Sequence, residues 1–159
     1  MKLKKILIAI DDSPFAEHAA AYGFDIAYTY NAKVGLVHIV EPMVMPVTTT
    51  DPTISSSLPG IGMNDLELLD IQNNAGETLI EKTIKKFAKG LEVTQFNEFG
   101  STADGILACS EQFKADLVVV GTHSRTGLDR FLMGSIAEEV IRHSLVPVLV
   151  VPMKEHESR

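Results

Sequence analysis

Five short runs of apolar residues alternate with longer segments of helical periodicity along this chain. The runs cover residues 6–10, 34–40, 91–96, 117–120 and 146–151, and the third is the weakest because it alternates with polar residues. Short, continuous apolar runs are typical of strands buried on both faces. A crossover between parallel strands needs a dozen or more residues, usually in a helix. The alternation therefore predicts an α/β fold with an open, five-stranded parallel sheet and helices on both faces.

Local signals mark the helices between these runs. Ser13 suits the N-cap of the first helix and Pro14 its first position, and Asn31 stands near its end. The other helices are expected from about Asp65 to Gly90, after Thr102, and from Ser135 to His143. In the second of the four, an apolar stripe is predicted from Leu68, Ile71, Ala75, Leu79, Ile80, Ile84 and Phe87.

The length and composition suit one domain. A chain of 159 residues with 45% hydrophobic residues can bury a single core, so one domain is expected over residues 1–159. Prolines, threonines and serines break every period over residues 41–62, which predicts a long flexible loop, and residues 153–159 form a C-terminal tail. Pro147 cannot donate to a strand ladder, which places the last strand at a sheet edge.

Charge and composition narrow the classes of function. Lys and Arg total 14 against 21 Asp and Glu, and the net charge of −7 disfavours nucleic acid as a partner. The apolar runs are too short to cross a bilayer, and the first residues lack the apolar region of a signal peptide. The single cysteine, Cys109, is expected to be buried and gives no internal disulfide or zinc site. These features predict a cytoplasmic protein without membrane insertion.

The segment after the fourth strand carries the clearest signal of a binding site. Gly121, Thr122, His123 and Ser124 leave the strand, and a Gly-Ser pair then opens the last helix. Unpaired amides at a helix N-terminus, together with the helix dipole, favour an anion, and glycines let the main chain approach it. Ligands in open parallel sheets bind beyond the carboxyl ends of the strands, where the strand order reverses. If the first and fourth strands are neighbours, Asp11 faces this segment across one crevice.

Several of these residues also have a purely structural interpretation. Asp11 and Asp12 could cap the first helix, and a catalytic pair is disfavoured because adjacent side chains seldom face one another. His38, within an apolar strand, is more typical of a hydrogen-bonded core histidine than of a base. His123 is the better functional candidate, although a structural hydrogen bond explains it equally well. Arg125 could reach a phosphate or be solvated.

A family resemblance follows from the spacing of these residues. Gly121-x2-Ser124-x9-Gly134-Ser135, between an Ala-Asp-Leu-Val-Val-Val-Gly strand and a Val-Pro-Val-Leu-Val-Val strand, resembles the universal stress protein family. Nucleotide-binding members of that family carry Gly-x2-Gly-x9-Gly-Ser/Thr. The opening Lys-Lys-Ile-Leu-Ile-Ala-Ile-Asp-Asp-Ser and the later Leu-Val-His-Ile-Val are also similar. The resemblance implies a Rossmann-like fold of the adenine nucleotide alpha-hydrolase type with strand order 3-2-1-4-5.

The resemblance also implies that the ligand is ATP, with ADP or AMP as alternatives. In this family the Gly-rich segment and the Gly-Ser helix start hold phosphates and ribose, and backbone matching Ala9 and the region around Ile39 and Val40 meets adenine. Asp11 would lie near the nucleotide and near a Mg²⁺ held largely by phosphates and water. The residues that we expect to contact the nucleotide are Ala9, Asp11, Ile39, Val40, Gly121, His123, Ser124, Arg125, Gly134, Ser135 and Ile136.

The leading hypothesis is an ATP-binding regulatory or protective module of the stress response. The resemblance implies a homodimer paired through the last strand, Val146–Val151, and an unidentified protein partner is expected. No reaction is demanded, because the chain has no Gly-x4-Gly-Lys-Ser/Thr loop and no paired catalytic carboxylates. Slow ATP hydrolysis, with His123 or Asp11 aligning water, is one alternative. A protein-interaction module that does not bind nucleotide is another, supported by Ser124 at the usual position of the second glycine. The His-x-x-His and Ser-Gly-Gly-x-Asp-Ser signatures of nucleotidyltransferases and ATP pyrophosphatases are absent.

Overall fold

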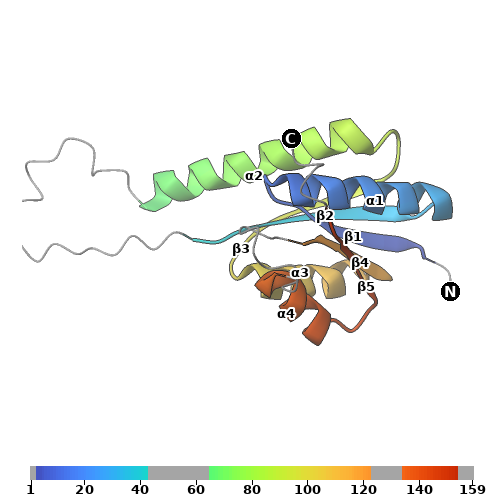
Figure 1. Cartoon of the computed structure of the whole chain (residues 1–159). Coiled ribbons are helices and arrows are strands. Elements are labelled where there is room, and N and C mark those ends of the chain that lie inside the picture. Colours follow the sequence, from blue (N-terminus) through green and yellow to red (C-terminus); the bar gives the residue numbers. More distant parts are fainter. Residues whose placement is uncertain (1–2, 43–64, 123–133, 154–159) are drawn as a thin grey trace, which may run out of the picture.

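The computed structural model describes residues 3–42, 65–122 and 134–153. Within these ranges, one parallel sheet has the order β3-β2-β1-β4-β5, with α1 and α2 on one face and α3 and α4 on the other (Figure 1). This confirms the predicted fold class and strand order. The strands are β1 (Lys5–Ala9), β2 (Lys33–Val40), β3 (Val93–Phe99), β4 (Leu117–Gly121) and β5 (Val148–Val151). The helices are α1 (Pro14–Tyr30), α2 (Asp65–Phe87), α3 (Thr102–Phe113) and α4 (Ser135–His143).

The first helix begins and ends where its sequence signals predict. The Ser13 hydroxyl accepts a hydrogen bond from the Ala16 amide at 3.2 Å, and Pro14 occupies the first helical position. Asn31 adopts the left-handed conformation (φ 51°) and ends the helix, donating its own amide to carbonyls of the last turn. Both ends of α1 are thus specified by neighbouring residues.

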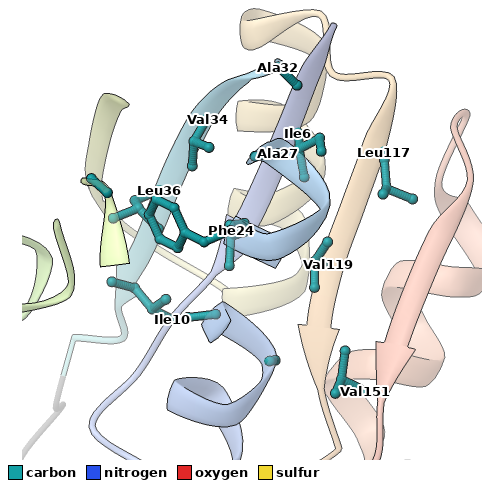
Figure 2. Packing of buried hydrophobic residues seen from close by; sticks show 14 of the residues in the cluster. Ile6, Ile10, Phe24, Ala27, Ala32, Val34, Leu36, Leu117, Val119 and Val151 are labelled. Carbon is teal, nitrogen blue, oxygen red and sulfur yellow. The ribbon is translucent and has the colours of Figure 1, made fainter. Parts of the chain in front are cut away.

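The core has two layers, one on each face of the sheet. Successive side chains of β1 alternate between them, so Ile6 and Ile8 face α1 while Leu7 faces α3. In the first layer, Phe24 of α1 lies beside Leu36 of β2 (Figure 2). Ile6, Leu7 and Ile8 are fully buried, which explains the continuous apolar run of this central strand.

Two strands, β3 and β5, differ from the expected runs by two residues or more at an end. The third strand, predicted at 91–96, spans Val93–Phe99, because its backbone continues to pair with β2 through Asn97, Glu98 and Phe99 whatever their side chains. The last strand begins at Val148, because Ser144 binds both the amide and the carbonyl of Val146. It lies at the sheet edge, as Pro147 predicted.

The apolar stripe of α2 is only partly buried. Ile80 is buried and Leu79, Ile84 and Phe87 pack against the first core layer, but Ile71 is 53% exposed. Ala75, also in the predicted stripe, is exposed. The first turns of α2 extend beyond the sheet in Figure 1, so the sheet covers only the later part of the stripe. No helix within 3–42, 65–122 and 134–153 is both long and apolar enough to cross a membrane.

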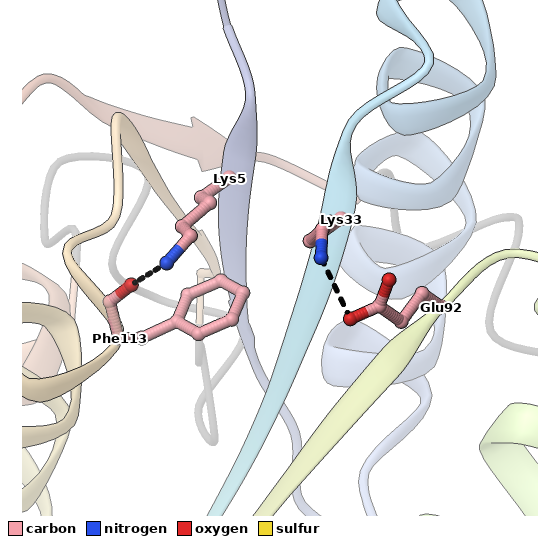
Figure 3. Close-up of polar contacts among 4 residues, drawn as sticks. All are labelled: Lys5, Lys33, Glu92 and Phe113. Carbon is pink, nitrogen blue, oxygen red and sulfur yellow. Dashed lines mark hydrogen bonds and ion pairs between the residues drawn. The ribbon is translucent and has the colours of Figure 1, made fainter.

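Polar contacts join neighbouring elements at the amino ends of β1 and β2 (Figure 3). The Lys5 ammonium donates to the Phe113 carbonyl at 3.0 Å and lies 5.1 Å from the centre of the Phe113 ring. Lys33 forms an ion pair with Glu92 at 2.9 Å, and the Asp116 carboxylate accepts from the Lys5 amide at 2.9 Å. These contacts lie at the end of the sheet opposite to the carboxyl ends of the strands.

Candidate functional site

A cavity of about 650 Å³ opens at the carboxyl ends of β1, β2 and β4. This is the point where the strand order reverses, because β1 is followed in space by β2 on one side and by β4 on the other. Open α/β sheets usually bind ligands at such a point. The position predicted for a ligand therefore coincides with a cavity of suitable size.

Seven of the predicted site residues line this cavity. They are Ala9, Asp11, Ile39, Gly121, Gly134, Ser135 and Ile136. Val40 does not line it: its side chain is buried, and its carbonyl accepts a hydrogen bond from the Gly100 amide at 3.0 Å. His123, Ser124 and Arg125 lie outside the described residues, as does most of the predicted 41–62 loop.

Other lining residues were not expected from the sequence. Glu41 directly follows β2, and Thr102 and Ile106 belong to the start of α3. The rule that selected Asp11, a polar side chain after a parallel strand, also applies to Glu41 and would have found it. No sequence signal indicates that the start of α3 lies beside the end of β2. The lining residues outside the predicted contact set also include Ile10, Asp12, Ser13, Phe15, Ala16, Val120 and Ala137.

The segment after β1 is held by local hydrogen bonds. One oxygen of the Asp11 carboxylate accepts from the Ser13 amide at 2.8 Å, while Asp12 is exposed. Asp11 thus orders the turn before α1, and Ser13 provides the cap itself. The His38 ring makes a hydrogen bond from Nδ1 to the Ile10 carbonyl at 3.1 Å, which matches the interpretation of His38 as a hydrogen-bonded core histidine.

Gly121 permits a close approach between β4 and α1. A Cβ atom at this position would lie 2.7 Å from the Phe15 carbonyl oxygen and 3.3 Å from the Ala16 amide nitrogen. Backbone atoms cannot move aside as a flexible side chain can, so any larger residue would separate the two elements. The glycine therefore brings the end of β4 and the start of α1 to the same side of the cavity.

Three helices of the described part of the chain begin at the cavity, and their N-termini differ. The Ser13 hydroxyl caps α1. The Glu41 carboxylate accepts from Thr102 at α3, from its amide at 3.2 Å and from its hydroxyl at 2.5 Å. At α4, Gly134 is the N-cap, and no side chain of the described residues caps that end. The first amides of α4 are therefore open to an anion, as far as the described side chains are concerned.

The charged side chains among the described lining residues are all acidic. They are Asp11, Asp12 and Glu41, with no lysine or arginine beside them. No group of three His, Cys, Asp or Glu side chains suited to a metal ion occurs in the described ranges. An anion in this cavity would therefore depend on main-chain amides, and the carboxylates would favour an accompanying cation.

Solved structures of similar fold include several with nucleotides. The chain resembles that of hypothetical protein MJ0577 with 26% identity and a TM-score of 0.76, covering 98% of this chain and 99% of the other. A universal stress protein family protein from Arabidopsis thaliana, At3g01520 with AMP bound, has 18% identity and a TM-score of 0.67, with 98% and 95% covered. Universal stress proteins in complex with cAMP, and with dAMP from Archaeoglobus fulgidus, have TM-scores of 0.68 and 0.61.

Sequence comparison assigns the family. Universal stress protein MJ0531 from Methanocaldococcus jannaschii is 36% identical over 156 residues, which cover 96% of this chain and 85% of the relative. The model of the Universal stress protein family matches residues 2–152. By sequence and by fold, the chain belongs to the universal stress protein family.

Proposed function

We propose that this chain binds an adenine nucleotide, ATP with Mg²⁺ in particular, and acts through a protein partner as a nucleotide-dependent regulatory or protective module of the stress response. The observation that carries the proposal is the N-terminus of α4, which opens into the cavity without a side-chain cap from the described residues. Structural neighbours with cAMP, dAMP and AMP support it, since these ligands share an adenine base, a sugar and a phosphate.

The two ends of the cavity suit the two ends of a nucleotide. At α4, the amides of Ser135, Ile136 and Ala137 precede the first bond within the helix, which Glu138 donates to the Gly134 carbonyl. Such a helix start favours a phosphate group. Near the end of β2, the buried side chains of Ile39 and Ile106 provide apolar walls for a base.

The acidic lining fits a nucleotide that arrives with a cation. Because three carboxylates surround the cavity without a lysine or arginine from the described residues, bare phosphates would meet repulsion. Mg²⁺ neutralises phosphate charge when it is bound, and it is usually held by phosphates, waters and one or two carboxylates. Asp11 is the residue expected to lie beside it, with its side chain already oriented by the Ser13 amide.

Nucleotide binding is tested with the purified protein. Mass spectrometry of gently denatured protein identifies any nucleotide that copurifies, and calorimetric titration then measures ATP, ADP and AMP with and without Mg²⁺. We expect saturable binding, with Mg²⁺ increasing the affinity for ATP and Asp11→Asn reducing that increase. If none of the three nucleotides binds at millimolar concentration, the proposal is wrong and the protein-interaction module becomes the better hypothesis.

We also propose a cytoplasmic homodimer paired through the edge of β5. Val148, Leu149 and Val150 are partly exposed at this edge, and Leu145 just before it is 85% exposed. An uncovered apolar edge strand invites pairing with another chain. Sedimentation at micromolar concentration should give twice the monomer mass, and Leu145→Glu should shift the protein toward monomer. A monomeric wild-type protein would refute this pairing.

A further inference from the structure

Glu41 lines the cavity, and Thr102 at the start of α3 donates hydrogen bonds to its carboxylate. Its Oε1 atom accepts both the amide and the hydroxyl hydrogen bonds of Thr102, at 3.2 and 2.5 Å. Its Oε2 atom has no hydrogen bond to any of the residues that the structure describes. The start of α3 thus fixes a carboxylate that keeps one oxygen available beside the cavity that it lines.

Glu41 and the start of α4 give the cavity two regions of opposite chemistry. An ionised carboxylate accepts hydrogen bonds and cannot donate them, so an uncharged group placed against Glu41 must be a hydrogen-bond donor. It also occupies the N-terminus of α3, where a phosphate would otherwise be favoured. The uncapped amides of α4 provide donors at the other end. A phosphorylated ligand is therefore oriented with its phosphate toward α4 and its other end toward Glu41.

Glu41 also stands beside the apolar wall of the cavity. Ile39 and Glu41 are two residues apart at the end of β2, and residues at this spacing in extended chain point to the same side. Ile39 is 8% exposed, and Ile106 of α3, at 2% exposed, also lines the cavity. A flat base packed on these isoleucines would bring its edge to the carboxylate.

We propose that Glu41 determines the base specificity of this site, its Oε2 atom accepting a hydrogen bond from the exocyclic amino group of adenine. The inference rests on the proposed nucleotide binding and deepens it. Thr102 is the positioning residue, because it holds the other oxygen of the same carboxylate. Hypoxanthine carries a carbonyl oxygen in place of this amino group, and that oxygen is repelled by the carboxylate.

The test compares AMP with inosine monophosphate, in which a carbonyl oxygen replaces the exocyclic amino group and the neighbouring N1 carries a hydrogen. Calorimetric titration gives both dissociation constants for the wild type, Glu41→Gln and Thr102→Val. The wild type should bind AMP roughly tenfold more tightly, as expected for a hydrogen bond to a charged group. Glu41→Gln should bring this ratio close to one, because an amide can either donate or accept. Thr102→Val should lower the ratio, because the carboxylate is no longer held.

Glu98→Gln is the matched control. It removes one carboxylate from β3, beside Ile39 in the strand register, but Glu98 does not line the cavity. This variant should keep the wild-type ratio. Because both ligands are measured on the same protein, a loss of folded protein changes both titrations and leaves the ratio of dissociation constants intact.

The outcomes separate the two proposals. If the wild type binds neither AMP nor any other adenine nucleotide, the proposed function fails and this inference fails with it. If the wild type binds AMP, three results would each overturn the role of Glu41 alone: equal binding of inosine monophosphate, binding of guanosine monophosphate as tight as that of AMP, or an unchanged ratio in Glu41→Gln.

Discussion

Gly134→Ala provides a sharp test of the proposed phosphate end. Gly134 is the N-cap of α4, lines the cavity and has φ 84° and ψ 137°. Residues with a side chain are rarely found in this conformation, and holding one there costs roughly 1–3 kcal/mol. The alanine variant can keep the backbone and lose stability, or rotate to negative φ and turn the first amides of α4 away from the ligand.

The strain sets the size of the expected effect. If rotation of the backbone relieves all of the strain in the alanine variant, nucleotide affinity falls by up to roughly 5- to 150-fold, because 1–3 kcal/mol corresponds to that change in the dissociation constant. Calorimetric titration with AMP measures the affinity, and urea denaturation measures the free energy of unfolding. The loss of binding free energy and the loss of free energy of unfolding should together amount to roughly 1–3 kcal/mol.

Gly90→Ala is the matched control. Gly90 also has a positive φ, of 94°, and a Cβ atom there would meet nothing within 4 Å. It lies between α2 and β3, at the amino end of the sheet, and does not line the cavity. Gly90→Ala should therefore lose stability while keeping the wild-type affinity. Gly134→Ala with an affinity within twofold of the wild type, or equal losses of affinity in both variants, would refute the reasoning.

Three further predictions concern stability. Ser13→Ala removes the hydroxyl that caps α1 and should lower the free energy of unfolding by about 1 kcal/mol in urea denaturation; an unchanged midpoint would contradict the cap. Lys114→Gly should raise the free energy of unfolding by roughly 0.5–1 kcal/mol, because Lys114 ends α3 at φ 55°, where glycine is not strained. A destabilised variant would contradict this reasoning. Burial, with a smaller effect of Glu98, raises the pKa of the Cys109 thiol from 9.0 to about 11. The thiol of the unfolded chain ionises first, so stability is retained below pH 9 and falls between pH 9 and 11. Denaturation across this range should show a smaller decline for Cys109→Ala than for the wild type, and equal declines would exclude the thiol as a cause.

Local signals determined the elements of the fold. Ser13, Pro14 and Asn31 specified both ends of α1, because caps act through hydrogen bonds within one turn of the chain. The apolar runs predicted buried parallel strands, because both faces of such a sheet are covered. The boundary of β3 was missed because Asn97 and Glu98 interrupt the apolar pattern, while the backbone continues to pair with β2.

The sequence by itself also indicated which edge of the sheet a ligand would use. Asp11 follows β1, Gly121 ends β4, and the Gly-Ser pair starts the helix that comes after β4, so all three belong to the carboxyl ends of strands. Only the tertiary structure placed Thr102 against Glu41, a contact across 61 residues that leaves one carboxylate oxygen without a partner among the described residues. The periodicity of helices and strands and the capping of helices depend on residues that are near neighbours in the chain, so sequence patterns indicate them. The contact of Glu41 with α3 depends on how separate elements pack on a shared sheet, so it leaves no local pattern.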